Sequence, residues 1–351
     1  MIVYLLDNNF KKVKLIDEYI SLIWTDRYNE AGDFELYLNA SLENVETFQI
    51  GMYLSSTSSE HMMIIETVEI KSDIEDGSKL IVSGRSLESI LSRRIVWNQT
   101  IFENKSIQDI IYKLLNDSVI APTNINRRIA NFIFNRIDDE QVNAIKLDRQ
   151  YTGDNVYSII NDLCMQYGIG FKLLRINGEF QFSIYKGKDH TQNVDSFVMF
   201  SPRFDNLISS NVIASIKEMM NVACVAGEGE GNERKIISAG NEIVGLDRIE
   251  LFVDARNISS RTDSNVNLSD AQYKSLLKAK GIEELNGHSF KTTIESEVDY
   301  NGIFQYKKDF DVGDIVNVSN EFGYSGKLRI TELVISDSID GITIVPTFKA
   351  I

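Results

Sequence analysis

The stretch Val225-Ala-Gly-Glu-Gly-Glu-Gly-Asn-Glu-Arg234 is the most informative segment of the chain. Its alternating glycines are similar to those of a phosphate-binding loop, in which backbone N–H groups face an anion in front of a lysine or a helix N-terminus. Glu228, Glu230 and Glu233 would instead repel a phosphate, and the apolar segment that follows has the pattern of a strand. We therefore interpret this segment as an acidic loop between two strands, which indicates a β-rich chain without a nucleotide site.

Short segments rich in β-branched and aromatic residues occur on both sides of this loop and near both ends of the chain. Phe34, Leu36 and Leu38 alternate with less apolar residues, as in a half-buried strand, and Asn, Asp, Gly and Ser separate the segments. The pattern predicts one small β-barrel-like domain over residues 1–100 and a second over 205–245 plus 290–351. The expected strands are 3–6, 19–24, 33–38, 63–70, 79–83, 211–216, 221–226, 289–295, 314–318, 327–335 and 342–348.

The middle of the chain has a helical periodicity, which predicts an α/β module over residues 101–204. Ser106 precedes an apolar stripe at helical spacing and has a capping-box-like position. A second helix is expected between Asp154, as its N-cap, and Gly168, as its end. The pair Asn177-Gly178 then predicts a β-hairpin with a type I′ turn.

A third helix is predicted within a small helical insertion, residues 246–289. Ser269 and Gln272 form a capping box at its start, and Gly281 is its expected end. The lysines at 274, 278 and 280 would then lie toward the negative end of the helix dipole. The sequence thus predicts an α+β, β-rich fold: two small β-barrel-like domains, an α/β module between them and a small helical insertion.

No residue pattern indicates catalysis. The histidines His61, His190 and His288 have no metal-ligand partners at suitable spacing, and His190 and His288 have turn-like surroundings. No nucleophile elbow occurs. Acidic pairs such as Asp138-Asp139 and Glu283-Glu284 fit solvated loops better than a glycosidase pair. We therefore predict no catalytic residue, no cofactor and no metal ion.

Two further motifs have plain structural interpretations. Cys164 and Cys224 lie in apolar runs, and no export leader opens the chain, so both are expected to be buried free thiols. Residues 26–33 are similar to a calcium-binding loop, but Ala31 occupies the position that needs glycine. A β-turn that carries Gly32 explains this motif.

The chain carries 51 acidic and 36 basic residues, with a net charge of −15. An acidic protein lacks the electrostatic footprint that grips DNA or RNA. Solubility explains this charge, and so does a channel surface along which nucleic acid moves without sticking. No apolar run reaches the roughly 20 residues of a membrane-spanning helix, so no membrane insertion is expected.

Several segments in one order give the chain a wider similarity. It resembles the siphophage tail hub family described as gene product 37-like proteins, and the resemblance extends over nearly the whole length. The matching segments are 24–36, 84–91, 200–207, the glycine-rich loop that leads into 245–256, and 309–316.

The resemblance implies a structural, non-catalytic baseplate hub, similar to that of contractile-tailed phages. Such a hub is a homotrimer around a central channel, in which two barrel-like domains per subunit match the sixfold tail tube. The implied partners are distal tail and other baseplate proteins, the tape-measure protein and receptor-binding proteins, while DNA passes without specific binding. The implied location is the virion tail tip, after synthesis in the host cytoplasm. No lytic domain is expected after Ile351.

The candidate site is the acidic loop, placed at a subunit or channel surface. Two other functions stay open: a tail-associated cell-wall hydrolase or peptidase, and a carbohydrate-binding receptor module. Trp24 and Trp97 could serve the latter as stacking platforms, although core packing explains the aromatic residues better. The residues assigned to the loop site are Gly227, Glu228, Gly229, Glu230, Gly231 and Arg234.

Overall fold

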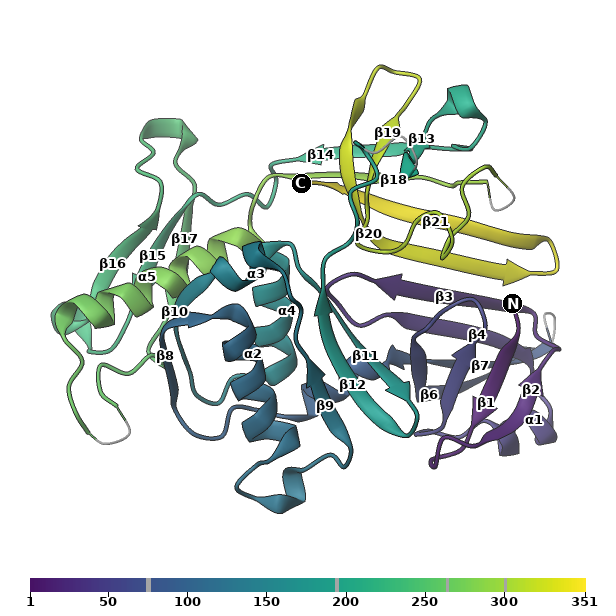
Figure 1. The fold of residues 1–351 in the computed structure, drawn as a ribbon, viewed down its shortest axis with the longest axis horizontal. Helices are drawn as coiled ribbons and strands as arrows, with labels where there is room; N and C mark the ends of the chain where they lie inside the picture. Colours follow the sequence, from purple (N-terminus) through teal and green to yellow (C-terminus); the bar gives the residue numbers. More distant parts are fainter. Residues whose placement is uncertain (74–76, 193–195, 263–264, 300–301) are drawn as a thin grey trace. The chain divides into compact units, whose positions relative to one another are not determined.

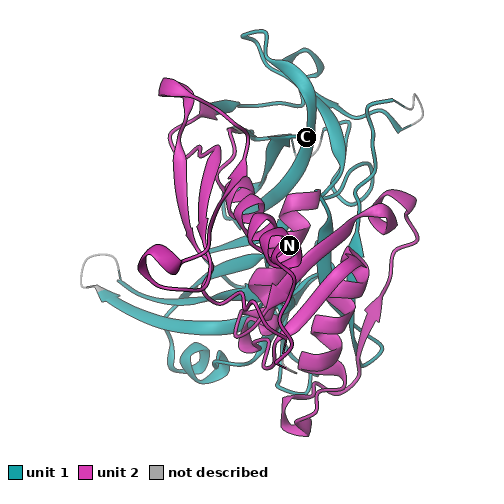
Figure 2. Cartoon of the chain, turned by 90° about the vertical axis from the view of Figure 1, so that its left-hand side faces the viewer, with its two compact units in different colours: residues 1–89, 168–213, 292–351 teal, residues 90–167, 214–291 magenta. Residues whose placement is uncertain are grey.

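The computed structural model describes residues 1–73, 77–192, 196–262, 265–299 and 302–351. The chain forms two compact units, coloured separately in Figure 2. Unit 1 contains residues 1–89, 168–213 and 292–351, and unit 2 contains 90–167 and 214–291. Strand accounts for 42% and helix for 22%, so the α+β, β-rich class is confirmed.

Unit 1 is built around one continuous sheet with the strand order β14-β18-β21-β20-β3-β4-β7-β6-β5-β1-β2 (Figure 1). Its remaining strands are the short β13, which is parallel to β19, and the hairpin β11–β12. Its elements are β1 (Val3–Leu6), β2 (Lys12–Ile16), β3 (Ser21–Arg27), β4 (Asp33–Asn39), α1 (Leu42–Thr47), β5 (Tyr53–Ser56), β6 (Met62–Asp73), β7 (Gly77–Ser86), β11 (Gly170–Ile176), β12 (Glu179–Tyr185), β13 (Met199–Phe200), β14 (Asn211–Ser215), β18 (Lys291–Glu295), β19 (Ile315–Ser319), β20 (Ser325–Ser338) and β21 (Gly341–Ala350).

The antiparallel pairing of β3 with β20 joins two halves of this sheet, from Arg27 opposite Glu332 to Ser21 opposite Ser338. The N-terminal half surrounds a core that includes Trp24, Leu36 and Leu54. The C-terminal half has its own core, which contains Phe200, Leu333 and Phe348. The sheet thus has two halves, each packed on its own core.

Unit 2 combines three longer helices with two small sheets, β10–β8 and β16-β15-β17. Strand β15 is antiparallel to β16 and parallel to β17. Its elements are β8 (Thr100–Ser106), α2 (Ile107–Leu115), η2 (Asn116–Ile120), η3 (Ile125–Arg127), β9 (Phe132–Asn135), α3 (Glu140–Ala144), β10 (Lys146–Tyr151), α4 (Val156–Tyr167), β15 (Val222–Ala226), η6 (Gly231–Glu233), β16 (Ile236–Gly240), η7 (Gly245–Asp247), β17 (Glu250–Asp254) and α5 (Asp270–Gly287), while η1 (Leu87–Arg93) links the units in sequence.

The grouping of residues 205–245 with 290–351 differs from this arrangement. Strands β15 and β16 pair with each other. They belong to unit 2, where Ala223, Val225 and Ala239 share a core with apolar residues of α5. The division of the chain into four segments otherwise stays a proposal.

The local signals for helix starts were mostly correct. The Ser106 side chain accepts a hydrogen bond from the Asp109 amide at the start of α2, as predicted. At α4 the cap differs from the expected Asp154: the Asn155 side chain accepts from the amides of Tyr157 and Ser158. Asp154 instead accepts from Thr152 N in the preceding turn.

Helix α5 begins at the predicted capping box but does not end at Gly281. The helix continues to Gly287, and Gly281 faces the small sheet. A Cβ atom at Gly281 would lie 2.5 Å from Val225 Cγ2 and 2.7 Å from Ala239 Cβ. The glycine therefore allows close packing of helix on sheet. The dipole interpretation of the lysines was also wrong, because no basic residue lies in the last turn of the longer helix. Lys274 instead pairs with Asp270, and Lys280 with Glu283 and Glu284.

The predicted hairpin is confirmed. Ile176 and Glu179 form the last pair of β11 and β12, and Asn177 and Gly178 have φ angles of 50° and 83°. Both positive values fit a type I′ turn. Cys164 is a buried free thiol, as expected, whereas Cys224 is only half-buried, because it lies on the face of β15 that α5 does not cover.

Within the described ranges, no helix combines the length and the apolarity needed to cross a lipid bilayer.

Candidate functional site

The glycine-rich loop is a well-bonded connection between β15 and β16. Gly227 N donates to Lys235 O at 2.8 Å, and Lys235 N donates to Glu228 O at 2.9 Å, which extends the strand pairing into the loop. Gly229 has a φ of +100°, and a Cβ there would lie 2.6 Å from Glu233 O. The loop therefore needs glycine at this position for its own folding, and no bound anion is required to explain it.

Glu228 is tied to its own subunit. Its backbone N–H donates to the Tyr273 hydroxyl at 2.8 Å, and its carboxylate accepts from Ser260 Oγ at 2.5 Å. Partial burial would raise the pKa of Glu228, but the hydrogen bonds from Ser260 and Ser259 outweigh it and hold this pKa below its ordinary value. Glu228 thus fixes the loop to α5 and to the segment after β17.

Arg234 fastens the loop to the neighbouring strand. Its guanidinium donates to the carbonyls of Gly227 and Ala226 at 3.1 and 3.0 Å, and to Asp254 Oδ1 at 2.7 Å. Arg256 also pairs with Asp254, and these hydrogen bonds lower the pKa of Asp254 to about 2. Arg234 therefore stabilises the contact between β15 and β17.

The remaining carboxylates of the loop are exposed. Glu230 precedes the short helix η6 without a side-chain cap, and Glu233 ends that helix. Gly231 opens η6 with a φ of +54°. The structure therefore divides the predicted site: Gly227, Glu228, Gly229, Gly231 and Arg234 build the loop, and Glu230 is free to face another surface. Glu233, outside the predicted set, is exposed beside it.

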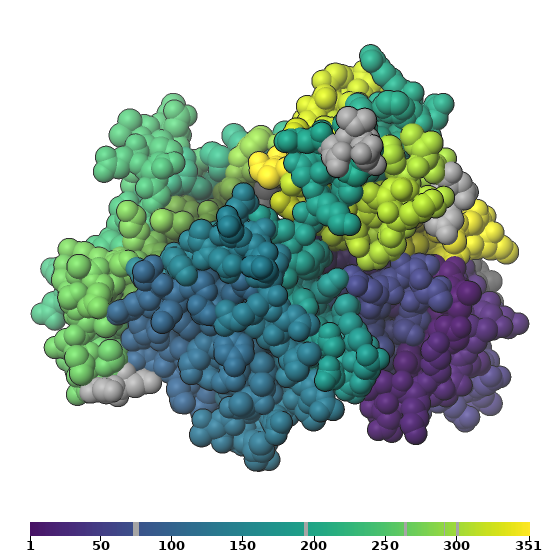
Figure 3. Space-filling model, viewed as in Figure 1, coloured from purple at the N-terminus to yellow at the C-terminus, as the bar shows by residue number. Residues whose placement is uncertain are grey.

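Sequence reasoning missed an exposed apolar tip on the connection between β16 and β17. Val244 is 84% exposed and Leu246 is fully exposed beside η7. This connection projects beyond the ends of its strands in the ribbon and space-filling views (Figures 1 and 3). The only signal was an apolar pair around Gly245 in a polar stretch, and such a pair does not distinguish a tip from a core residue.

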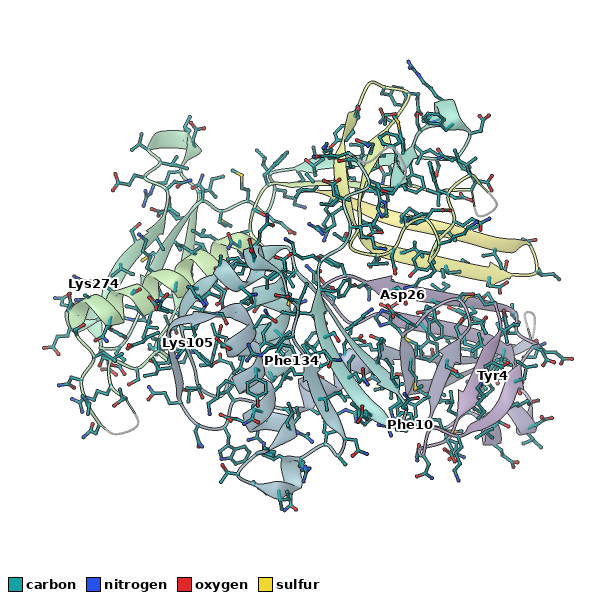
Figure 4. All side chains as sticks on the ribbon, in the orientation of Figure 1. Tyr4, Phe10, Asp26, Lys105, Phe134 and Lys274 are labelled. Atoms are coloured by element: carbon teal, nitrogen blue, oxygen red, sulfur yellow. The ribbon has the colours of Figure 1, made fainter. Side chains whose placement is uncertain are left out.

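A buried polar network in unit 1 was also missed. Asp26 on β3 (Figure 4) accepts hydrogen bonds from Trp24 Nε1, Ser59 Oγ and the Tyr306 hydroxyl at 3.1, 2.8 and 2.7 Å. These partners use its oxygens, so Asp26 is a core residue. Gly32 does lie in the turn between β3 and β4, as expected.

His61 and Glu88 form a buried pair in the same unit, with His61 Nδ1 3.0 Å from Glu88 Oε1. Burial alone would lower the pKa of His61, but the charges of Glu88 and Asp26 outweigh it and raise this pKa to about 9. Burial would raise the pKa of Glu88, but His61 holds it below its ordinary value. The pair is therefore charged at neutral pH and contributes to the stability of unit 1.

His190 is buried, and the prediction of a turn there was wrong. Its Nδ1 lies 2.8 Å from Ser196 O and its Nε2 lies 2.9 Å from Asp314 Oδ2. Both ring nitrogens thus lie within hydrogen-bond distance of oxygen atoms of the protein. His288 caps the end of α5. The residues that the structure describes contain no cluster of three or more potential metal ligands.

The two acidic pairs have different surroundings: Asp138 and Asp139 lie in a loop, in which Asp138 is exposed, as expected, whereas Glu283 and Glu284 lie on α5. Asp139 caps α3 by accepting from the Val142 amide. Glu283 lies on α5, where it is nearly buried between Arg149 and Lys280. The carboxylates of Asp139 and Glu283 are thus engaged with the fold.

The two tryptophans have opposite surroundings. Trp24 is fully buried in the core of the N-terminal half and cannot be a stacking platform. Trp97 is 65% exposed and lies in a groove of unit 2.

The fold is shared with phage tail proteins. A tail protein from Neisseria meningitidis MC58 is similar with a TM-score of 0.58 at 14% identity, over 99% of this chain and 96% of that chain. The 43 kDa tail protein of prophage MuSo2 from Shewanella oneidensis has a TM-score of 0.58 at 12% identity, over 99% and 97% of the two chains. The prophage tail protein gp18 from Listeria monocytogenes EGD-e has a TM-score of 0.52 at 12% identity, over 100% and 95%.

These likenesses define the class of fold, that of phage tail proteins. The chain belongs to the family of siphovirus ReqiPepy6 Gp37-like proteins, which matches residues 2–348. The resemblance drawn from the sequence is thereby confirmed. No curated protein matches the chain significantly. Family and fold together support a structural protein of the phage tail or baseplate.

Proposed function

We propose that this protein is a baseplate hub subunit of a siphophage tail tip, which assembles as a homotrimeric ring between the tail tube and the tip. The observation that carries the proposal is the family match over residues 2–348 together with the doubled architecture of unit 1. Each subunit has two β-rich halves with separate cores. Three subunits would present six such halves to a sixfold tube.

The negative net charge of the chain is compatible with a central channel through which DNA passes. Three subunits would carry three times the net charge of −15. DNA binding by counterion release needs basic side chains on the protein, so a lumen lined by carboxylates would let DNA slide. Glu230 and Glu233 are exposed carboxylates of the candidate loop, and we place this loop at the channel or at a subunit contact.

The proposed partners are the distal tail protein, other baseplate proteins, the tape-measure protein and receptor-binding proteins, and the proposed location is the virion tail tip. Immunogold labelling of intact phage with antibodies against this chain tests that location. We expect gold at the distal end of the tail, in line with the tube. Labelling of the capsid, of the whole tail length, or of no part of disrupted particles would contradict it.

A catalytic role has less support. His61 and His190 are both buried against carboxylates. A zymogram on host cell wall separates the two functions. The hub function predicts no cleared band, and a cleared band that persists in the purified chain would establish a hydrolase.

A further inference from the structure

A groove of about 670 Å³ lies within unit 2, between the segment before β8, the end of α2 and the η3 turn. Figure 1 labels β8 and α2, which form two of its sides. Trp97 contributes an indole that is 65% exposed. A large aromatic side chain left exposed in a concave site is a candidate for ring stacking with a ligand.

Arg127 supports this indole from one side. Its guanidinium carbon lies 5.2 Å from the centroid of the Trp97 ring, and its Nη2 donates to Ile95 O at 2.6 Å. The guanidinium is thereby held in place over the ring. Because Trp97 stays mostly exposed with Arg127 in this position, a surface of the indole is left for a ligand.

Arg127 lines the groove, and two further arginines, Arg94 and Arg93, lie near it outside the lining. Arg94 Nε donates to Arg127 O at 3.1 Å, and Arg94 Nη1 donates to Arg93 O at 3.1 Å. Among the described residues, none of the three forms an ion pair with a carboxylate. Burial and the charges of Arg127 and Arg93 lower the pKa of Arg94. An unneutralised cationic cluster is unusual in a chain with a net charge of −15 and favours an anionic ligand.

The rest of the lining contains polar side chains that can form hydrogen bonds with the hydroxyl groups of a ligand. Asn98 and Thr123 supply an amide and a hydroxyl, which can donate and accept hydrogen bonds. Lys113 and Asp117 neutralise each other at 2.7 Å. A sugar ring has an apolar face for an indole and hydroxyl groups for such a lining.

We propose that this groove binds an anionic saccharide, with a sugar ring stacked on the exposed surface of Trp97 and a carboxylate or phosphate substituent paired with Arg127, whose positive charge the nearby Arg94 and Arg93 reinforce. This site is separate from the ring assembly proposed above and does not depend on it. Single-stranded nucleic acid fits less well, because its recognition uses successive aromatic platforms in a basic channel. Trp97 is the only aromatic residue that lines the groove within the described part of the chain.

The test is a fluorescence titration of the full-length protein. The chain has two tryptophans and Trp24 is buried, so a change in emission on ligand binding reports Trp97. The probes are hexagalacturonate as the carboxylate arm, pentamannose 6-phosphate as the phosphate arm, neutral maltohexaose, and the oligonucleotide dT6. We expect one or both anionic saccharides to bind at least tenfold more tightly than maltohexaose and dT6, and the better arm identifies the anionic group.

Variants assign the binding to this groove, with calorimetry as the readout because Trp97→Ala removes the fluorophore. Trp97→Ala and Arg127→Gln should each weaken binding of the anionic saccharide at least fivefold. Phe322→Ala, which removes an aromatic side chain that is 86% exposed in unit 1, should leave the affinity unchanged. Circular dichroism melts confirm that each variant folds.

Three outcomes would overturn the proposal. One is the absence of binding by either anionic saccharide at millimolar concentration. Another is dT6 binding as tightly as the saccharides, which would assign the groove to nucleic acid. The third is saccharide binding that survives unchanged in Trp97→Ala.

Discussion

At the scale of single residues, the side chains that matter most are polar groups held by partners far away in the sequence. Glu88 is almost completely buried and depends on His61 for neutralisation and on the amide of Leu173 for a hydrogen bond. Removing one partner of a buried ion pair leaves an uncompensated charge, which typically costs about 3–5 kcal/mol. These contacts fix the interior of unit 1.

The His61–Glu88 pair predicts a loss of stability at alkaline pH. His61 has a folded pKa of about 9, above its ordinary value of 6.5, so its contribution is fully present below pH 6.5 and is lost as the pH rises through 9. The free energy of unfolding, measured by chemical denaturation from pH 6 to pH 9.5, should fall over this window. Glu88→Gln should flatten that dependence and lower stability at pH 6. An unchanged slope in Glu88→Gln would contradict this account.

The hydrogen bond from the Glu228 amide to the Tyr273 hydroxyl is expected to stabilise the candidate loop. Tyr273→Phe removes the hydroxyl that accepts from the Glu228 amide and should lower the free energy of unfolding by about 1 kcal/mol. Hydrogen exchange at the Glu228 amide should speed up in this variant. Tyr4→Phe is the control, because Tyr4 contacts Lys12 through its ring. Removal of the Tyr4 hydroxyl should change neither the free energy of unfolding nor the exchange rate of the Glu228 amide. Equal effects of the two substitutions would refute the role assigned to Tyr273.

Such residue pairs could not be derived from the sequence. The Ser269–Gln272 capping box was found because its partners are three residues apart. His61 and Glu88 are 27 residues apart and His190 and Asp314 are 124 apart, so only the folded chain brings them together. For the same reason the loop was recognised as an acidic connection, while the anchoring of Glu228 by Tyr273 and Ser260 was not foreseen.

At the scale of elements, α5 shows how tertiary packing overrides a local signal. Glycine commonly ends a helix because it adopts a positive φ, and Gly281 carries that signal. The structure uses Gly281 for a close approach to β15 and β16, so the helix runs through it. Periodicity and capping therefore predicted where the helix begins, but its end depended on a contact with strands more than 40 residues away.

Two glycines of α5 give a matched prediction. Gly281→Ala should destabilise the protein by about 1–3 kcal/mol, because overpacking against Val225 and Ala239 outweighs the gain in helix propensity of up to about 1 kcal/mol. A methyl group at position 287 would meet no atom within 4 Å, so Gly287→Ala should be neutral or slightly stabilising. Thermal melts of both variants compare them directly. A Gly281→Ala protein as stable as Gly287→Ala would show that the helix does not pack as described.

At the scale of the whole molecule, the order of β and α elements followed from periodicity and turn residues. The assembly of each unit from separated segments did not, because no local pattern reveals that β3 pairs with β20 more than 300 residues later. The candidate site has the same limit. The role of its exposed carboxylates belongs to the proposed assembly, which no local sequence pattern reveals.

The channel position of the loop predicts an effect on DNA release. Glu230→Lys with Glu233→Lys should slow DNA ejection from assembled particles severalfold, because lysines on a lumen surface would bind phosphates. Glu321→Lys with Asp340→Lys makes the same charge change at exposed residues of unit 1 and should leave the rate unchanged. Real-time ejection triggered by receptor measures both. Identical ejection rates in the two double variants would show that the loop does not line the channel.

The central claim is the trimeric ring, and mass in solution combined with end-on electron microscopy of the purified chain tests it most directly. The account predicts a species of about 120 kDa, three times the subunit mass of 39.9 kDa, that forms rings with threefold symmetry and a central hole. A chain that stays monomeric at high concentration and in the presence of its tail partners, or a closed assembly of another symmetry, would contradict it.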